Sequence, residues 1–355
     1  MSRSTPRQTH PSATPRRPAT LGRMSDAQLL DLRFCDLKLT IDGRLAERVD
    51  RLYRDLADKG LDRFRPHCWL SSEWFSPDGV PGIAIPFYLA HPRLMKLEKT
   101  QMLSVEGGSE KDCLRILRHE AGHCIDTAYR LHRRKRWREL FGSFAAPYPD
   151  AYKPRPNSRR FVTHLDGWYA QAHPAEDFAE TFAVWLQPRS RWRSQYRGWP
   201  ALRKLEYVDE LMAEIADSPN PAPVRSRKQI EPLRSDRRTL REHYRQKKLQ
   251  YADAFPEFYD ADLHKIFSES PRFKHRPTAA SFLRRIRAEL RDNVARWTGA
   301  HAYTIDQVLR DMIDRSKELN LRLAVPESKA RSEATMMVTV QTMNYMLSGH
   351  HPVAL

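Results

Sequence analysis

The feature that most constrains this chain is a pair of histidines four residues apart, His119 and His123, in the pentapeptide His-Glu-Ala-Gly-His. The pentapeptide lies in a stretch from about residue 110 to 137 whose apolar residues recur at helical spacing: Leu114, Leu117, Ala121, Ile125 and Ala128. Positions i and i+4 of a helix lie about 40° apart around its axis and one turn along it. Both imidazoles therefore face the same side of the predicted helix, where they can bind one metal ion.

Glu120 follows the first histidine and gives the pair a chemical meaning. A zinc ion held by two imidazoles polarises a carbonyl group and activates water for attack. Glu120 can then take a proton from that water and pass it to the leaving amine, as a general base does. The same pattern also occurs by chance on solvated helix faces, so a third ligand is needed to identify a metal site.

Two nearby candidates for the third ligand fail on geometry. The metzincin pattern requires a histidine six residues beyond the second ligand, and that position is Tyr129. His132 lies nine residues after His123, which is roughly half a turn around the helix and about 13 Å along it if the helix continues. We therefore expect the third ligand to lie further downstream.

A second predicted helix, opened by Pro174 and reaching about Gln187, offers two carboxylates on one face. We predict that Glu176 is the third zinc ligand and that Glu180, one turn later, accepts the free ring N–H of a ligand histidine. The alternative is a charged i, i+4 pair on the surface. Asp177 is expected to interact with the helix dipole and not with the metal.

Together the two motifs resemble the gluzincin division of zinc peptidases. His119-Glu120-x-x-His123 followed by Glu176-Asp-Phe-Ala-Glu180 is close to the lethal-factor-type pattern, and the fuller string from His173 to Phe182 resembles a bacterial group of zinc-binding metallopeptidases. The resemblance covers roughly residues 110–190, about a quarter of the chain. It implies a zincin-like catalytic domain that uses Zn²⁺ to hydrolyse peptide bonds.

The resemblance also implies a role for Tyr169, which lies seven residues before the predicted ligand Glu176. In lethal-factor-like enzymes a tyrosine at this spacing stabilises the developing oxyanion, so Tyr169 is expected to donate its hydroxyl to the tetrahedral intermediate. The alternative is a tyrosine that packs beside Trp168 under the loop.

Two strand-like runs, residues 67–75 and 82–89, flank the turn signal Pro77-Asp78-Gly79. Pro86 places the second run at a sheet edge, because proline cannot donate a hydrogen bond to a ladder. The resemblance to zincins implies that a polypeptide substrate binds as an added strand along such an edge, above the active helix.

The chain divides into four predicted parts. Residues 1–23 contain no acidic residue and are rich in Ser, Thr, Pro and Arg, which predicts a disordered basic arm. Residues 24–218 are the zincin-like catalytic domain, 219–250 a basic linker or helix after three closely spaced prolines, and 251–355 a helical accessory region. The fold class is α+β, with a small sheet and an active-site helix. The C-terminal region is mainly α-helical, with helices expected at 277–298, 304–319 and 331–348.

The formal net charge of +17 permits binding to nucleic acid or to an acidic partner. The alternative function is therefore a nucleic-acid-associated basic protein in which the zincin domain is subordinate or inactive. Against it, the sequence has no zinc ribbon and no recognition helix, and the stretch 225–248 is also typical of a solvated helix face. No segment approaches the roughly 18 apolar residues of a membrane span, and no secretory signal is visible, so we expect a cytoplasmic protein.

Overall fold

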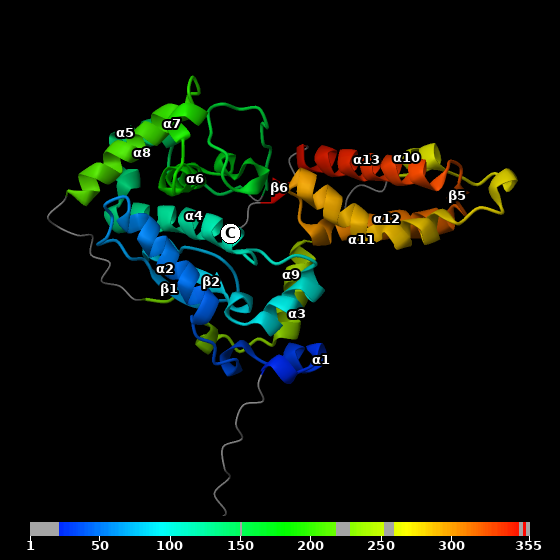
Figure 1. Cartoon of the computed structure of the whole chain (residues 1–355), viewed down its shortest axis with the longest axis horizontal. Coiled ribbons are helices and arrows are strands. Elements are labelled where there is room, and N and C mark those ends of the chain that lie inside the picture. The colour runs from blue at the N-terminus through cyan, green and yellow to red at the C-terminus, as the bar shows by residue number, and fades with distance from the viewer. Residues whose placement is uncertain (1–20, 150, 218–227, 252–258, 348–350, 353–355) are drawn as a thin grey trace, which may run out of the picture.

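The computed structural model describes residues 21–149, 151–217, 228–251, 259–347 and 351–352. The described chain is mostly helical with small sheets (Figure 1). Most of the predicted basic arm, residues 1–20, lies outside the described residues, as does the proline-rich segment 219–223. None of the described helices combines the length and apolar character needed to cross a membrane.

The first sheet joins β1 (His67–Ser71) to β2 (Gly82–Pro86) in parallel, with His67 opposite Gly82 and Ser71 opposite Pro86. Between the two strands the chain turns back, and Phe75 forms an antiparallel bridge to Ala84 on the other side of β2. The expectation that the second run forms the sheet edge is therefore wrong at Ala84, which is paired on both sides. Among the described residues no strand pairs beyond Phe75, so the edge lies at the Phe75 segment.

The two-histidine helix is α4 (Glu110–Tyr129), which is shorter than the predicted 110–137. Ser109 caps its start, since the Ser109 hydroxyl accepts the Asp112 backbone N–H at 3.1 Å. The helix ends because Arg130 adopts the left-handed conformation, with φ of 52°. The turn buries Leu131 completely before α5 (Lys135–Phe141) begins. Burial of Leu131 therefore favours a bend at Arg130, although the sequence has no glycine or proline there that would predict one.

The second site helix is α6 (Pro174–Leu186), close to the predicted bounds. Its N-cap is His173, whose Nδ1 accepts the Ala175 backbone N–H at 3.1 Å, and Pro174 occupies the first turn. Every residue from Ala175 to Leu186 is buried. The helix lies between α4 and α8 (Ala201–Ala216), and α4 is covered on its other side by β2 and α2 (Gly43–Ala57) (Figure 1).

One core joins the N-terminal helices, the first sheet and the elements around α4 and α6. The remaining helices of this core are α1 (Asp26–Leu30), α3 (Pro92–Met102), α7 (Trp192–Gln195) and α9 (Leu240–Gln250). Along the chain, α3 follows β2 and precedes α4, and it packs against α9; it was not anticipated from the sequence. Leu240 and Tyr244 of α9 belong to the same core, so part of the segment predicted as a basic linker or helix packs against the site-bearing region.

A second core holds the C-terminal helices together. They are α10 (Asp260–Ile266), α11 (Ala279–Thr298), α12 (Ala302–Glu318) and α13 (Glu327–Tyr345), close to the predicted helices for the last three. The other strands of the described residues form two short antiparallel pairs. In one, β4 (Phe267–Ser268) pairs with β5 (Arg322–Leu323), and in the other, β3 (Ala151–Tyr152) pairs with β6 (His351–Pro352). In Figure 1 these helices form an elongated lobe beside the first core.

Candidate metal centre

The two predicted histidine ligands lie one turn apart on the face of α4 that meets α6. Their Nε2 atoms are 3.1 Å apart, and the rings are nearly perpendicular, with an interplanar angle of 74°. His119 is 2% exposed, so it is not part of a solvated helix face. The i, i+4 geometry expected from the sequence is therefore present, with both Nε2 atoms aimed at one point.

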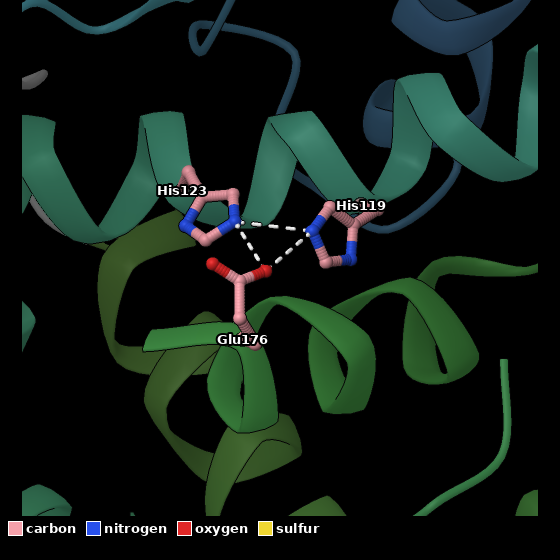
Figure 2. Close-up of side chains that lie close together, drawn as sticks. All are labelled: His119, His123 and Glu176. Atoms are coloured by element: carbon pink, nitrogen blue, oxygen red, sulfur yellow. Dashed lines mark hydrogen bonds and ion pairs between the residues drawn. The ribbon is translucent and has the colours of Figure 1, made fainter. Parts of the chain in front are cut away.

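Glu176, in the first turn of α6, brings a carboxylate to the same point (Figure 2). Its Oε2 is 3.0 Å from His119 Nε2 and 3.2 Å from His123 Nε2. Zinc–ligand bonds of 2.0–2.1 Å at tetrahedral angles separate neighbouring ligand atoms by about 3.3 Å. The three donor atoms thus have nearly the spacing and the chemical types of a zinc site. Among the described residues, His119, His123 and Glu176 form the group of potential metal ligands whose donor atoms all lie close to one another.

Glu180 lies one turn further along α6, behind His119. Its Oε1 is 2.9 Å from His119 Nδ1, and its Oε2 accepts the Leu165 backbone N–H at 2.8 Å. Since Nδ1 donates to the carboxylate, the Nε2 lone pair of His119 is left to face the metal position. This is the contact predicted for Glu180 from its spacing.

The charges of the cluster suit a bound cation. Burial by itself would raise the pKa of Glu176, but the charge of His123 and the hydrogen bonds from both histidines hold that pKa well below its usual range. Burial opposes protonation of His119, yet hydrogen bonds to Glu176 and Glu180 raise its pKa well above the usual value. The two carboxylates thus favour positive charge at this point, and a metal ion would supply it in place of ring protons.

Glu120 is 7% exposed, and its Oε2 has no hydrogen-bond partner among the described residues. Burial and the charge of Glu176 raise the pKa of Tyr169, and the charge of Glu120 adds to this effect. A buried carboxylate oxygen without a protein partner fits a group that exchanges a proton with a water molecule at the metal. The backbone oxygen of Glu120 accepts a hydrogen bond from the Ser76 hydroxyl at 3.3 Å.

Tyr169 lies beside His119, with ring centroids 5.6 Å apart. It belongs to the turn Asp166–Gln171, in which Gly167 and Trp168 both have positive φ, at 73° and 56°. This tight turn brings the tyrosine from the loop back toward α4. The structure therefore brings Tyr169, the residue singled out by the family resemblance, next to a predicted zinc ligand.

Tyr148 also contacts the site, although no sequence pattern singled it out. Its hydroxyl donates to Glu176 Oε1 at 2.9 Å, and its ring stacks on His173 at 3.8 Å. The residue lies in the Pro- and Arg-rich segment after α5, where no periodicity fixes a side-chain direction. Only its aromatic character within a loop near the motif was available as a signal.

Three further residues of this region, His132, Cys124 and Asp177, have other partners. His132 Nδ1 is 2.5 Å from Asp126 Oδ2, and the His132 ring stacks on Phe144. Cys124 is buried, its Sγ lies 3.5 Å from the Ser76 hydroxyl, and burial raises its thiol pKa well above the usual value. Asp177 pairs with Lys204 Nζ at 2.5 Å, so it links α6 to α8.

Residues 109–195 match the sequence profile of a protein family described as "Putative zinc-binding metallo-peptidase". The matched segment includes the whole of α4 and α6 and therefore His119, His123 and Glu176. No curated protein and no solved structure is detectably similar to this chain. The middle of the chain thus resembles this metallopeptidase family, and it contains a candidate His-His-Glu zinc site.

Proposed function

We propose that this chain is a zinc metalloendopeptidase-like hydrolase of the gluzincin type, with a zincin-like α+β catalytic domain. The observation that carries the proposal is the convergence of His119 Nε2, His123 Nε2 and Glu176 Oε2 within 3.0–3.2 Å, inside the segment that matches a metallopeptidase family. When bound there, Zn²⁺ supplies Lewis-acid polarisation of the scissile carbonyl and lowers the pKa of the attacking water.

The protein's own groups would perform the remaining steps. Glu120, buried and without a partner at Oε2 among the described residues, takes the proton of the attacking water and delivers it to the leaving amine. Tyr169, beside His119, donates its hydroxyl to the carbonyl oxygen as negative charge develops there. Glu180 holds the His119 ring with Nε2 directed at the metal position.

The peptidase family implies a polypeptide substrate, and the sheet offers a place for one. Phe75 pairs with β2 at the outer edge of the first sheet. The hydroxyl of its neighbour Ser76 contacts the backbone of Glu120. An extended peptide that paired with this segment would lie close to Glu120, the proposed general base on α4. We therefore assign the substrate edge to residues 75–77 in place of β2.

For the alternative, a nucleic-acid-associated protein, two of the described basic side chains of residues 225–248 are already paired within the protein. Arg241 pairs with Asp31 at 2.7 Å, and Lys247 is buried and pairs with Glu73 at 2.9 Å. Charges already neutralised within the protein are poorly suited to phosphate binding. We also infer a cytoplasmic location, because all four cysteines are free.

The proposal is tested with purified wild type, Glu176→Gln, Glu120→Gln and the exposed control Glu139→Gln. Zinc content after dialysis and cleavage of labelled casein are measured on the same preparations. We expect one zinc per chain in all but Glu176→Gln, and casein cleavage reduced at least about 100-fold in Glu120→Gln. Full zinc retention by Glu176→Gln would show that Glu176 is not the third ligand. Casein cleavage at the wild-type rate by Glu120→Gln would show that Glu120 is not the general base.

A further inference from the structure

The two oxygens of the Glu176 carboxylate have different partners. Oε2 faces the histidines, at 3.0 Å from His119 Nε2 and 3.2 Å from His123 Nε2. Oε1 accepts the hydroxyl hydrogen of Tyr148 at 2.9 Å. A carboxylate with one oxygen engaged in this way is fixed in rotation about its last bond, so that only Oε2 is presented to the metal position.

Tyr148 is itself held by the start of the helix that carries Glu176. Its ring lies flat against His173, with centroids 3.8 Å apart and an interplanar angle of 18°. His173 Nδ1 accepts the Ala175 N–H at 3.1 Å, which leaves its Nε2–H to donate to the Ala146 carbonyl at 2.8 Å. The N-cap of α6 therefore anchors both the loop and the tyrosine that reaches back to the ligand.

Tyr148 is more exposed than the carboxylate that its hydroxyl contacts. The tyrosine is 39% exposed, whereas Glu176 is 4% exposed. A hydroxyl in this position takes the place of a water molecule that would otherwise compete for the carboxylate.

We propose that Tyr148 is a positioning residue for the zinc site, which orients Glu176 as a one-oxygen ligand and excludes water from its other oxygen. The inference rests on the proposed zinc-binding function. It assigns Tyr148 a role distinct from that of Tyr169, which lies beside His119 and not on the Glu176 carboxylate. Removal of the Tyr148 hydroxyl should weaken zinc binding even when the fold and the ring stack are retained.

The test compares Tyr148→Phe with Tyr152→Phe in the full chain. Tyr152 comes from the same segment, and its hydroxyl donates to the Gly167 carbonyl at 2.8 Å. Zinc affinity is measured by competition with a chromogenic chelator, and the melting temperature of the metal-free proteins is measured in parallel. We expect Tyr148→Phe to bind zinc about 10-fold or more weakly than wild type, and Tyr152→Phe to bind it within about twofold.

The Co²⁺-substituted proteins supply a second readout, since the visible bands of Co²⁺ report the ligand geometry. We expect these bands to change in Tyr148→Phe and to remain in Tyr152→Phe. Unchanged zinc affinity and an unchanged Co²⁺ spectrum in Tyr148→Phe would overturn the role of Tyr148 and leave the zinc site intact. Failure of the wild type to bind zinc would overturn both proposals. An affinity loss matched by Tyr152→Phe would show that the effect belongs to the loop and would reject the assignment.

Discussion

Gly122 of α4 and Ala179 of α6 meet where the two helices cross, so closely that a Cβ atom on Gly122 would lie 2.8 Å from the Ala179 Cα. The obstructing atoms belong to the backbone of α6 and cannot rotate away. The missing side chain of Gly122 is therefore what lets Glu176 approach the two histidines. Helix separation at this crossing sets the size of the metal site.

Gly122→Ala should therefore destabilise the protein and weaken zinc binding, although alanine is the better helix former. Forced separation of packed elements typically costs about 1–3 kcal/mol, which exceeds the gain of about 1 kcal/mol in helix propensity. Urea unfolding of the metal-free protein and zinc competition measure the two effects. Gly22→Ala is the control, because no atom lies within 4 Å of a Cβ built there. A Gly122→Ala protein with wild-type stability and zinc affinity would contradict the packing argument.

Helical periodicity was sufficient to predict much of the site. His119 and His123, and then Glu176 and Glu180, are pairs whose relative placement depends on the helix alone, so their spacing determines which side chains share a face. The meeting of the two faces depends on the tertiary structure, and it was suggested by the chemistry of the four side chains and by the resemblance to gluzincins. Tyr148 could not be predicted, because a loop side chain is directed by contacts with distant elements and not by a period.

The fold shows the same division between local and non-local information. The bounds of α6 and α11 follow from caps and apolar spacing. The end of α4 at Tyr129 does not, because a positive φ at Arg130 is stabilised by the burial of Leu131 in the assembled core. The parallel pairing of β1 with β2 also depends on a return of the chain through Phe75, which a turn signal alone does not reveal.

Glu180→Gln tests the orientation of the first histidine. The amide keeps the shape of the side chain, but it loses the negative charge, and its N–H group cannot accept the Leu165 backbone N–H as Oε2 does at 2.8 Å. We expect zinc affinity to fall about 10- to 100-fold, which is the usual effect of altering a partner of a ligand histidine. Chelator competition measures this loss, and Glu139→Gln controls for the removal of a carboxylate. Zinc affinity equal to wild type would exclude a role for Glu180 in the site.

Arg118, which precedes the first ligand, anchors α4 to α2 through Asp55. The Asp55 carboxylate is 1% exposed and accepts from Arg118 at 2.7 and 2.9 Å and from Arg51 at 3.0 Å. Arg118→Met leaves a buried carboxylate with much less compensation, so we expect a loss of about 3 kcal/mol or more in unfolding free energy.

Arg51→Met is the matched control for this pair, since the Arg51 side chain is 46% exposed and its contribution is screened by solvent. It should cost less than about 1 kcal/mol. Denaturant unfolding of the metal-free variants gives both values. Equal losses of unfolding free energy in the two variants would show that the buried contact of Asp55 with Arg118 stabilises the protein no more than its exposed contact with Arg51.

His243 of α9 should make stability depend on pH in mildly acidic solution. It is 4% exposed among the rings of Phe34, Phe87 and Tyr244. Burial, reinforced by the positive charges of Lys247 and Arg238, lowers the pKa of His243 from 6.5 to about 3. Between these two values the unfolded chain binds a proton that the folded protein does not. The contribution of His243 to the unfolding free energy is therefore fully present above about pH 6.5 and is lost progressively as the pH falls toward 3.

From pH 7 to pH 5 this contribution should decrease by about 2 kcal/mol, because each unit between the folded and unfolded pKa values corresponds to about 1.4 kcal/mol. His243→Phe keeps a ring in the core and removes the titration, so its unfolding free energy should fall less than that of the wild type over the same interval. Urea titrations of the metal-free proteins at pH 5, 6 and 7 measure the difference in slope. His243→Leu serves as a second variant if phenylalanine overpacks the site, and the exposed His275→Phe controls for loss of an imidazole. If both His243 variants lose stability with pH as steeply as the wild type, the neutral buried imidazole is not the source of acid sensitivity in this core.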